Sequence, residues 1–140
     1  MSALPHERYR HYLETLTPET LERLSDYVTP DVRFADPFND VRGPVAMAAV
    51  FRDMFESVGD VRFTIRHMHT DRNHCLMAWT FAATLFGKPW HFDGTSEVEF
   101  AEDGRVAAHI DHWDAARHFY ERLPVIGWLL AKIRGRLKVD

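Results

Sequence analysis

The sequence predicts an α+β domain in which a curved antiparallel sheet carries about three helices on its concave face. Apolar residues recur at helical spacing through most of residues 5–58, whereas residues 61–115 are rich in β-branched and aromatic side chains and are interrupted by turn sequences. Helices followed by a meander of strands are typical of the α+β class, and a curved sheet of this kind encloses a cone. At 140 residues the chain has the length of one domain.

The first half of the chain predicts three helices around one short strand. Residues 5–16 form an amphipathic pattern, and residues 17–30 begin with a capping hydroxyl, a proline and an acid before the next helical stretch. Residues 32–37 predict a strand that closes at a proline. A Gly-Pro pair then opens a third helix over residues 44–58.

The second half predicts antiparallel strands joined by tight connections. Each segment is bounded by a turn sequence such as Asp-Arg-Asn, Gly-Lys or Glu-Asp-Gly. The segments are residues 61–70, 74–86, 88–100 and 105–115.

The last segment, residues 119–140, is apolar early and basic late. We expect it to pack as an amphipathic tail on the domain formed by residues 1–118. The alternative is a helix that contacts a membrane surface or a partner, because Trp128 and Ile133 lie close to Lys132 and other basic residues.

Bulk properties exclude several classes of protein. The net charge of -4 argues against nucleic acid as a partner, because phosphate binding needs a concentrated basic face. Neither a signal sequence nor a membrane-spanning run is visible, so we expect a cytoplasmic protein. Cys75 is the single cysteine, which rules out an internal disulfide and a cysteine-based metal cage.

Asp36 is the first candidate functional residue. Alternation places it on the face of the predicted strand that carries Val32 and Phe34. A buried charge without a partner is costly, which leaves two interpretations. Either the strand ends here and the carboxylate caps the turn before Pro37, or the carboxylate has been placed in a pocket.

The last predicted strand places His109, Asp111 and Trp113 on one face. Such a pair is either an acid–base dyad that lines a pocket or a buried pair in which the carboxylate holds a histidine tautomer. His112 is out of phase and should face the other side of the sheet, at the surface or an interface.

Aromatic side chains dominate the predicted inner face of the sheet, where they form either an ordinary core or an apolar cavity for a flat ligand. One polar residue, Ser96, shares that face with Trp90 and Phe92. The predicted pocket residues are Phe34, Trp79, Phe81, Trp90, Phe92, Ser96 and Trp113.

A metal site is not expected. His67 and His69 share a face, but no third ligand follows from the spacing, and a catalytic zinc ion needs three protein ligands.

The order of these segments resembles the nuclear-transport-factor-2-like superfamily of cone-shaped domains, which includes ketosteroid isomerases and SnoaL-like polyketide cyclases. In the isomerases a tyrosine of the first helix precedes the Asp-Pro pair by the separation found here between Tyr12 and Asp36, and that aspartate is the general base. The position of a second, protonated aspartate of those enzymes falls at or beside Ser96, which is a departure. The cyclases resemble the chain in keeping a His or Asp on the late strands, as at His109 and Asp111.

The resemblance implies a cofactor-independent enzyme that moves a proton next to a carbonyl group of a hydrophobic small molecule, as an isomerase, dehydratase or cyclase. Asp36 would remove the proton, Tyr12 would donate a hydrogen bond to the enolate, and His109, oriented by Asp111, would return the proton. Tyr12 could equally be a core residue. A homodimer through the outer sheet face is also implied. The alternative is a binding or assembly module without chemistry, in which side chains fill the cone.

Overall fold

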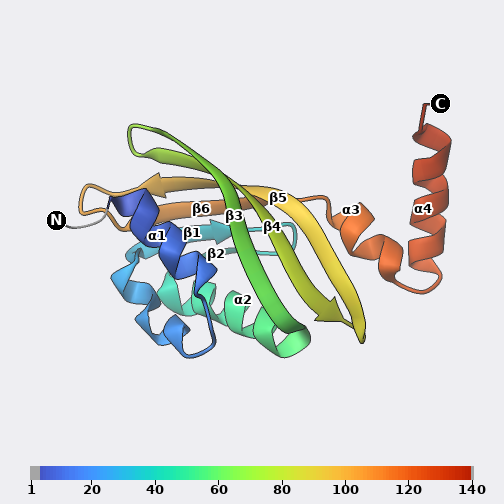
Figure 1. Cartoon of the computed structure of the whole chain (residues 1–140), viewed down its shortest axis with the longest axis horizontal. Helices are drawn as coiled ribbons and strands as arrows, with labels where there is room; N and C mark the ends of the chain where they lie inside the picture. The colour runs from blue at the N-terminus through green and yellow to red at the C-terminus, as the bar shows by residue number, and fades with distance from the viewer. Residues whose placement is uncertain (1–3, 140) are drawn as a thin grey trace.

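A strongly curved sheet of six strands forms the frame of the molecule in the computed structural model, which describes residues 4–139 (Figure 1). The elements in chain order are α1 (Pro5–Glu14), the 3-10 helix η1 (Thr20–Asp26), β1 (Val28–Ala35), β2 (Asp40–Arg42), α2 (Pro44–Ser57), β3 (Gly59–Asp71), β4 (His74–Leu85), β5 (Lys88–Phe100), β6 (Val106–His112), α3 (Ala115–His118), the 3-10 helix η2 (Tyr120–Arg122) and α4 (Ile126–Leu137). The predicted α+β class is confirmed, and the meander of long strands lies where the sequence placed it.

The strand order is β2-β1-β6-β5-β4-β3. Neighbouring strands are antiparallel except β1 and β6, which run parallel and place Phe34 opposite His109. This parallel pair brings the end of the first strand beside the end of the last one. Asp36, which follows β1, and Asp111, near the end of β6, therefore lie at the same edge of the cone.

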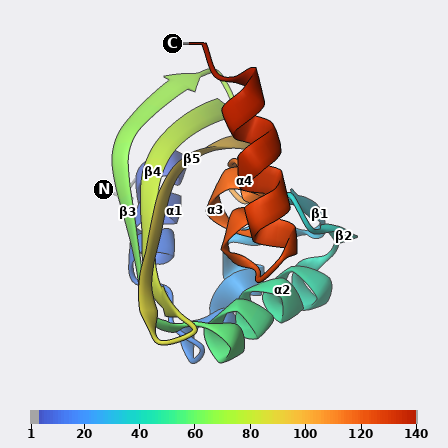
Figure 2. The ribbon, with the colours of Figure 1, turned by 90° about the vertical axis from the view of Figure 1, so that its right-hand side faces the viewer.

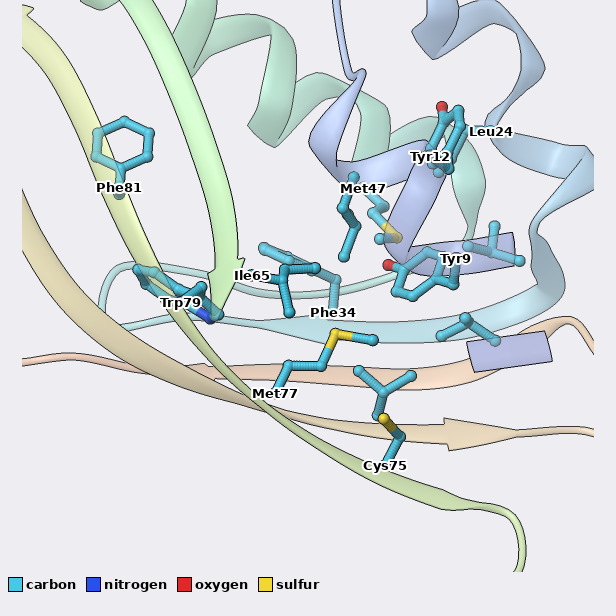
Figure 3. Close-up of a cluster of buried hydrophobic side chains, with 14 of the residues drawn as sticks. Tyr9, Tyr12, Leu24, Phe34, Met47, Ile65, Cys75, Met77, Trp79 and Phe81 are labelled. Atoms are coloured by element: carbon cyan, nitrogen blue, oxygen red, sulfur yellow. The ribbon is translucent and has the colours of Figure 1, made fainter. Parts of the chain in front are cut away.

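Helices α1 and α2 cover the concave side of the sheet, and Figure 2 shows the strands wrapping around them. The core fills the space between α1 and the sheet, where Tyr9, Met47, Ile65 and Met77 are buried (Figure 3). Burying aliphatic and aromatic side chains here contributes the main favourable term in folding. These core residues do not fill the part of the concave side that lies between the sheet and the C-terminal half of α2.

The second predicted helix is shorter than expected. Residues 20–26 form only the 3-10 helix η1, and β1 begins at Val28, so that Pro30 lies inside a strand. The sheet overrides local propensity here, because the amide of Val106 donates to the carbonyl oxygen of Tyr27 and draws the chain alongside β6. Pro30 is tolerated because the register of β1 against β6 shifts between Val28 and Arg33.

The C-terminal helix α4 extends beyond the end of the sheet (Figure 1) and has its main contacts with η2. The sequence predicts a tail packed on the domain, but most apolar side chains of α4 are exposed. Gly127 packs so tightly on the Glu121 carbonyl group that a Cβ atom there would clash with it. Across residues 4–139, no helix has the length and hydrophobicity required to cross a bilayer.

Candidate active site

The cone is hollow at one end. A cavity of about 780 Å³ lies between the sheet and α2, which is within the size range of small-molecule sites. Its walls are mainly aromatic and aliphatic, and Phe119, which follows α3, contributes to the wall. Six of the predicted pocket residues line it: Phe34, Trp79, Phe81, Trp90, Phe92 and Trp113.

Stacked rings form one wall of this cavity. Phe92 lies between Trp113, at a centroid separation of 4.3 Å, and the imidazole of His118, at 5.4 Å. Trp90 holds the α3 segment in place by donating its indole N–H to the His118 carbonyl oxygen at 2.6 Å. Strand β5 and the segment after β6 thus present flat apolar surfaces to a ligand, through Trp90, Phe92 and Trp113.

Asp111 is the polar centre of the cavity wall. Its Oδ1 atom accepts hydrogen bonds from the Ser96 hydroxyl at 2.5 Å and from His109 Nε2 at 2.7 Å. Among residues 4–139, no protein group donates to its Oδ2 atom, and the side chain lines the cavity. Asp111 therefore offers one unoccupied carboxylate oxygen to a bound molecule.

His109 lies behind Asp111 and is almost fully buried. Its Nδ1 atom lies 2.7 Å from the Tyr9 hydroxyl oxygen. Burial, with the nearby Asp111 carboxylate, raises the pKa of Tyr9 well above its usual value, so the phenol keeps its proton and can donate. With Asp111 ionised, one assignment satisfies every group: Tyr9 donates to Nδ1 and Nε2–H donates to Asp111.

Ser96 is fully buried and supports Asp111 from the neighbouring strand, where the two residues are directly paired. It also accepts a hydrogen bond from the Trp79 indole N–H at 2.8 Å. The indole lies directly over Gly94, where an added Cβ atom would clash with the ring. Ser96 was predicted to line the pocket, but the structure places it behind the cavity wall, as a support for Asp111 and Trp79.

Asp36 follows the last residue of β1 and caps the turn after it. Its Oδ1 atom accepts the backbone N–H groups of Phe38 at 2.8 Å and Asn39 at 2.7 Å, and the Asn39 amide is 3.1 Å away. The side chain also reaches the cavity wall. Asp36 thus caps the turn and also lines the cavity, and both of its oxygens have partners in the turn, because the Asn39 amide also donates to Oδ2 at 3.3 Å.

Tyr12 does not reach the cavity. Its hydroxyl donates to the Thr20 carbonyl oxygen at 2.8 Å, and its ring stacks on Tyr27 at a centroid distance of 4.0 Å. The side chain belongs to the core, because the side of α1 that bears it faces η1. The phenol beside the polar network is that of Tyr9, one turn earlier in the same helix. Sequence periodicity places both tyrosines on the apolar stripe and does not distinguish their partners.

The outer face of the sheet is polar. His112 is exposed there, as predicted from its phase, and its Nε2 atom lies 3.1 Å from Glu97 Oε2. His67 and His69 are also exposed, and the described part of the chain contains no cluster of three or more residues suited to hold a metal ion. The homodimer through this face stays a prediction.

The fold and site can now be compared with known proteins. The family model of the SnoaL-like domain matches residues 9–109. The chain belongs to the SnoaL-like domain family. The resemblance inferred from the sequence is thereby confirmed, and the matched range runs from Tyr9 to His109, the two ends of the buried hydrogen bond. No curated protein sequence matches this SnoaL-like chain.

Solved structures share the fold of this SnoaL-like domain at low identity. An NTF2-like protein of unknown function from Burkholderia pseudomallei is 18% identical with a TM-score of 0.73, over 82% of this chain and 94% of that chain. A LEH-like epoxide hydrolase from M. tuberculosis is 21% identical with a TM-score of 0.66, over 97% of this chain and 92% of that chain. A protein of ketosteroid isomerase-like fold from Catenulispora acidiphila, in complex with trimethylamine, is 11% identical with a TM-score of 0.70, over 84% and 91%. These likenesses establish the fold alone.

Proposed function

We propose that this SnoaL-like protein is an acid–base enzyme that moves a proton next to a carbonyl group of an apolar small molecule, with Asp111 as the group that takes the proton. One observation carries the proposal: Asp111 lines the aromatic cavity, a buried chain of donors holds its Oδ1 atom, and no group of residues 4–139 donates to its Oδ2 atom. A carboxylate oriented in this way inside an apolar site is suited to general base catalysis.

The roles differ from those expected from the sequence. Both ring nitrogens of His109 are engaged, by Tyr9 and by Asp111, so the imidazole has no free atom for a ligand. His109 is therefore a positioning residue, and Asp111 is the catalytic residue. Asp36, whose Oδ1 atom caps a turn, provides a second carboxylate at the same edge of the cavity.

The proposed step needs no group beyond these residues. Asp111 Oδ2 takes a proton from the carbon next to the carbonyl group, and the electrons of the broken C–H bond form the enolate. Return of the proton to another carbon completes an isomerisation. In a dehydration the enolate expels a β-hydroxyl group, which takes the proton from Asp111 and leaves as water. In a cyclisation the enolate carbon attacks a second carbonyl carbon, and the oxygen of that carbonyl takes the proton from Asp111.

The cavity favours a flat, largely apolar substrate. Stacked rings such as Phe92 and Trp113 bury flat faces well, and the polar wall is concentrated near Asp111. A ligand that enters with its carbonyl group toward Asp111 leaves its apolar part against α2. The alternative from the sequence, a binding module whose cone is filled by side chains, is not favoured by a cavity of about 780 Å³.

Deuterium exchange tests the proposal. The full chain, Asp111→Asn and Asp36→Asn are incubated in heavy water with a panel of enolisable cyclic ketones and diketones, and deuterium uptake is followed by NMR. We expect exchange with the wild type and with Asp36→Asn, and its loss in Asp111→Asn. Equal exchange by wild type and Asp111→Asn overturns the assignment. Absence of exchange across the panel overturns the proposal in favour of a ligand-binding module. Circular dichroism confirms that each variant is folded.

A further inference from the structure

The C-terminal helix carries an apolar stripe with no partner. Ile126, Leu129, Ile133 and Leu137 follow helical spacing along one face of α4 and are 56%, 51%, 48% and 78% exposed. Large aliphatic side chains left uncovered along a whole helix face mark an interaction surface. This stripe does not belong to the cavity, because residues from α4 are absent from the cavity wall.

Basic residues flank the stripe. Residues 122–139 contain five of the 17 lysines and arginines of the chain and none of its 21 acidic residues. Arg134 is paired with Glu121 at 2.9 Å, whereas the exposed side chain of Lys132 lies over the Trp128 ring, 5.0 Å from its centroid, and Arg136 is also exposed. The rest of the chain holds 12 of the 17 basic residues together with all 21 acidic ones, so residues 122–139 are a locally basic segment of an acidic chain.

The contacts that hold α4 against η2 leave the apolar stripe exposed. Three hydrogen bonds between the Arg134 guanidinium and the Glu121 carboxylate tie the side of the helix next to the stripe to η2, and Gly127, on that same side, packs on the Glu121 carbonyl group. The helix therefore stands away from the sheet with its apolar side facing outward, as Figures 1 and 2 show for its position relative to the strands.

We propose that α4 binds the surface of an anionic phospholipid bilayer. The stripe of Ile126, Leu129, Ile133 and Leu137 would lie among the acyl chains at the interface, and Lys132 and Arg136 would contact lipid phosphates. Helices that combine an apolar face with basic flanks bind in this way. Lying in the interface also suits the length of α4, because no helix in residues 4–139 can cross a bilayer.

Charge complementarity favours an anionic bilayer over a second copy of the chain. Two α4 helices that packed stripe against stripe would bring Lys132 and Arg136 near the same residues of the other copy, with no acid in residues 122–139 to pair with them. An anionic surface would cover the apolar stripe and also meet Lys132 and Arg136, which lie four residues apart on the same side of it. This proposal is independent of the chemistry assigned to Asp111. If the proposal holds, the side of the cavity lined by Phe119, seven residues before the start of α4, would lie near the bilayer.

Vesicle co-sedimentation with the full chain tests the proposal. Vesicles of phosphatidylcholine alone are compared with vesicles in which a third of the lipid is phosphatidylglycerol. We expect binding to the anionic vesicles, with a partition coefficient that falls about fivefold for each basic residue removed in the pair Lys132→Gln and Arg136→Gln. The pair Ile133→Ser and Leu137→Ser should abolish binding. A matched control, Lys88→Gln with Arg52→Gln, removes two exposed charges elsewhere and should bind like the wild type.

Several outcomes overturn the proposal. One is that the wild type does not sediment with anionic vesicles at low salt. Another is that the control pair loses as much vesicle binding as the α4 charge pair. Light scattering addresses the rival occupant: a wild-type dimer that becomes a monomer in Ile133→Ser with Leu137→Ser, without vesicle binding, assigns the stripe to a second copy. Circular dichroism verifies that each variant keeps its fold.

Discussion

His109 donates its Nε2–H to Asp111 Oδ1 across 2.7 Å, from a position two residues earlier on the same strand. The Tyr9 hydroxyl engages the other nitrogen of the ring, so the histidine holds the aspartate rather than the reverse. The Asp111 carboxylate collects hydrogen bonds from two sides on one oxygen and leaves the other for a ligand. Buried polar networks in which every group is satisfied rigidify a site in this way.

Removing the Tyr9 hydroxyl should weaken this support. In Tyr9→Phe the buried Nδ1 atom of His109 loses its donor, which should lower the free energy of unfolding by about 1–3 kcal/mol. Proton exchange should slow several-fold, because the imidazole is then free to change tautomer. Urea unfolding and NMR exchange measure the two effects.

Tyr12→Phe is the matched control for that variant. It removes the hydroxyl bonded to the Thr20 carbonyl oxygen, outside the cavity wall. The free energy of unfolding should fall by about 0.5–1.5 kcal/mol, and the exchange rate should not change. A slower exchange in Tyr12→Phe than in Tyr9→Phe would show that the phenol of the site has been misassigned.

Gly94 should tolerate no side chain. An added Cβ atom would clash with the Trp79 ring, and the indole would have to move away from Ser96. Gly94→Ala should therefore lower the free energy of unfolding by about 1–3 kcal/mol, as overpacking does. Urea unfolding and tryptophan fluorescence report the change.

Gly135→Ala is the control, because Gly135 is a helical position with open space around it. The free energy of unfolding should stay the same or rise in this variant. A lower free energy of unfolding in Gly135→Ala, with none in Gly94→Ala, would contradict the prediction.

Alkaline pH should destabilise the fold through its buried phenols. Burial raises the pKa of Tyr9 well above its usual value and that of Tyr12 to about 12. Both phenols ionise near pH 10 in the unfolded chain, so their contribution is complete below about pH 10 and is lost as the pH rises toward the folded values. Urea midpoints at rising pH should fall less steeply in Tyr9→Phe. Parallel curves for the two proteins would refute the contribution of Tyr9.

The Glu121–Arg134 pair should keep α4 folded against η2. The Arg134 guanidinium lowers the pKa of Glu121 by hydrogen bonding, so the pair persists at neutral pH and is lost as the pH falls through the lowered value. Glu121→Gln should speed amide hydrogen exchange in α4 at neutral pH, with little change in the global unfolding midpoint. Arg33→Gln, which breaks an exposed pair with Asp40, is the control and should leave α4 exchange unchanged. Equal protection of α4 in both variants would show that the Glu121 pair does not hold it.

Strand periodicity was sufficient to predict much of the site. His109 and Asp111 are two residues apart, and alternation alone places them on one face with Trp113, as the structure has them. The same rule predicts that His112 faces outward. Such statements are reliable because the direction of a side chain on a strand is a property of the local backbone.

The helical segments were less predictable. Residues 17–30 have the start signals of a helix, yet most of the stretch is a 3-10 turn and the beginning of β1. Pairing of β1 with β6 joins segments that are distant along the chain, and its hydrogen bonds outweigh a weak local preference. The three-residue strand β2 was missed for the same reason, since it exists only as a partner of β1.

Four features follow from the sequence alone: the α+β class, the order of the long strands, the aromatic inner face and the placement of His109 beside Asp111. Other features depend on how the elements pack. Tyr9, and not Tyr12, meets His109, which lies 100 residues away in the chain. Asp36 caps a turn, Asp111 Oδ2 has no donor among residues 4–139, and α4 extends beyond the end of the sheet. Periodicity is a local property of the chain, whereas these features depend on contacts between residues that are distant in sequence. Periodicity records which side of an element is apolar, whereas a hydrogen bond between elements depends on how they pack, to within a fraction of an ångström.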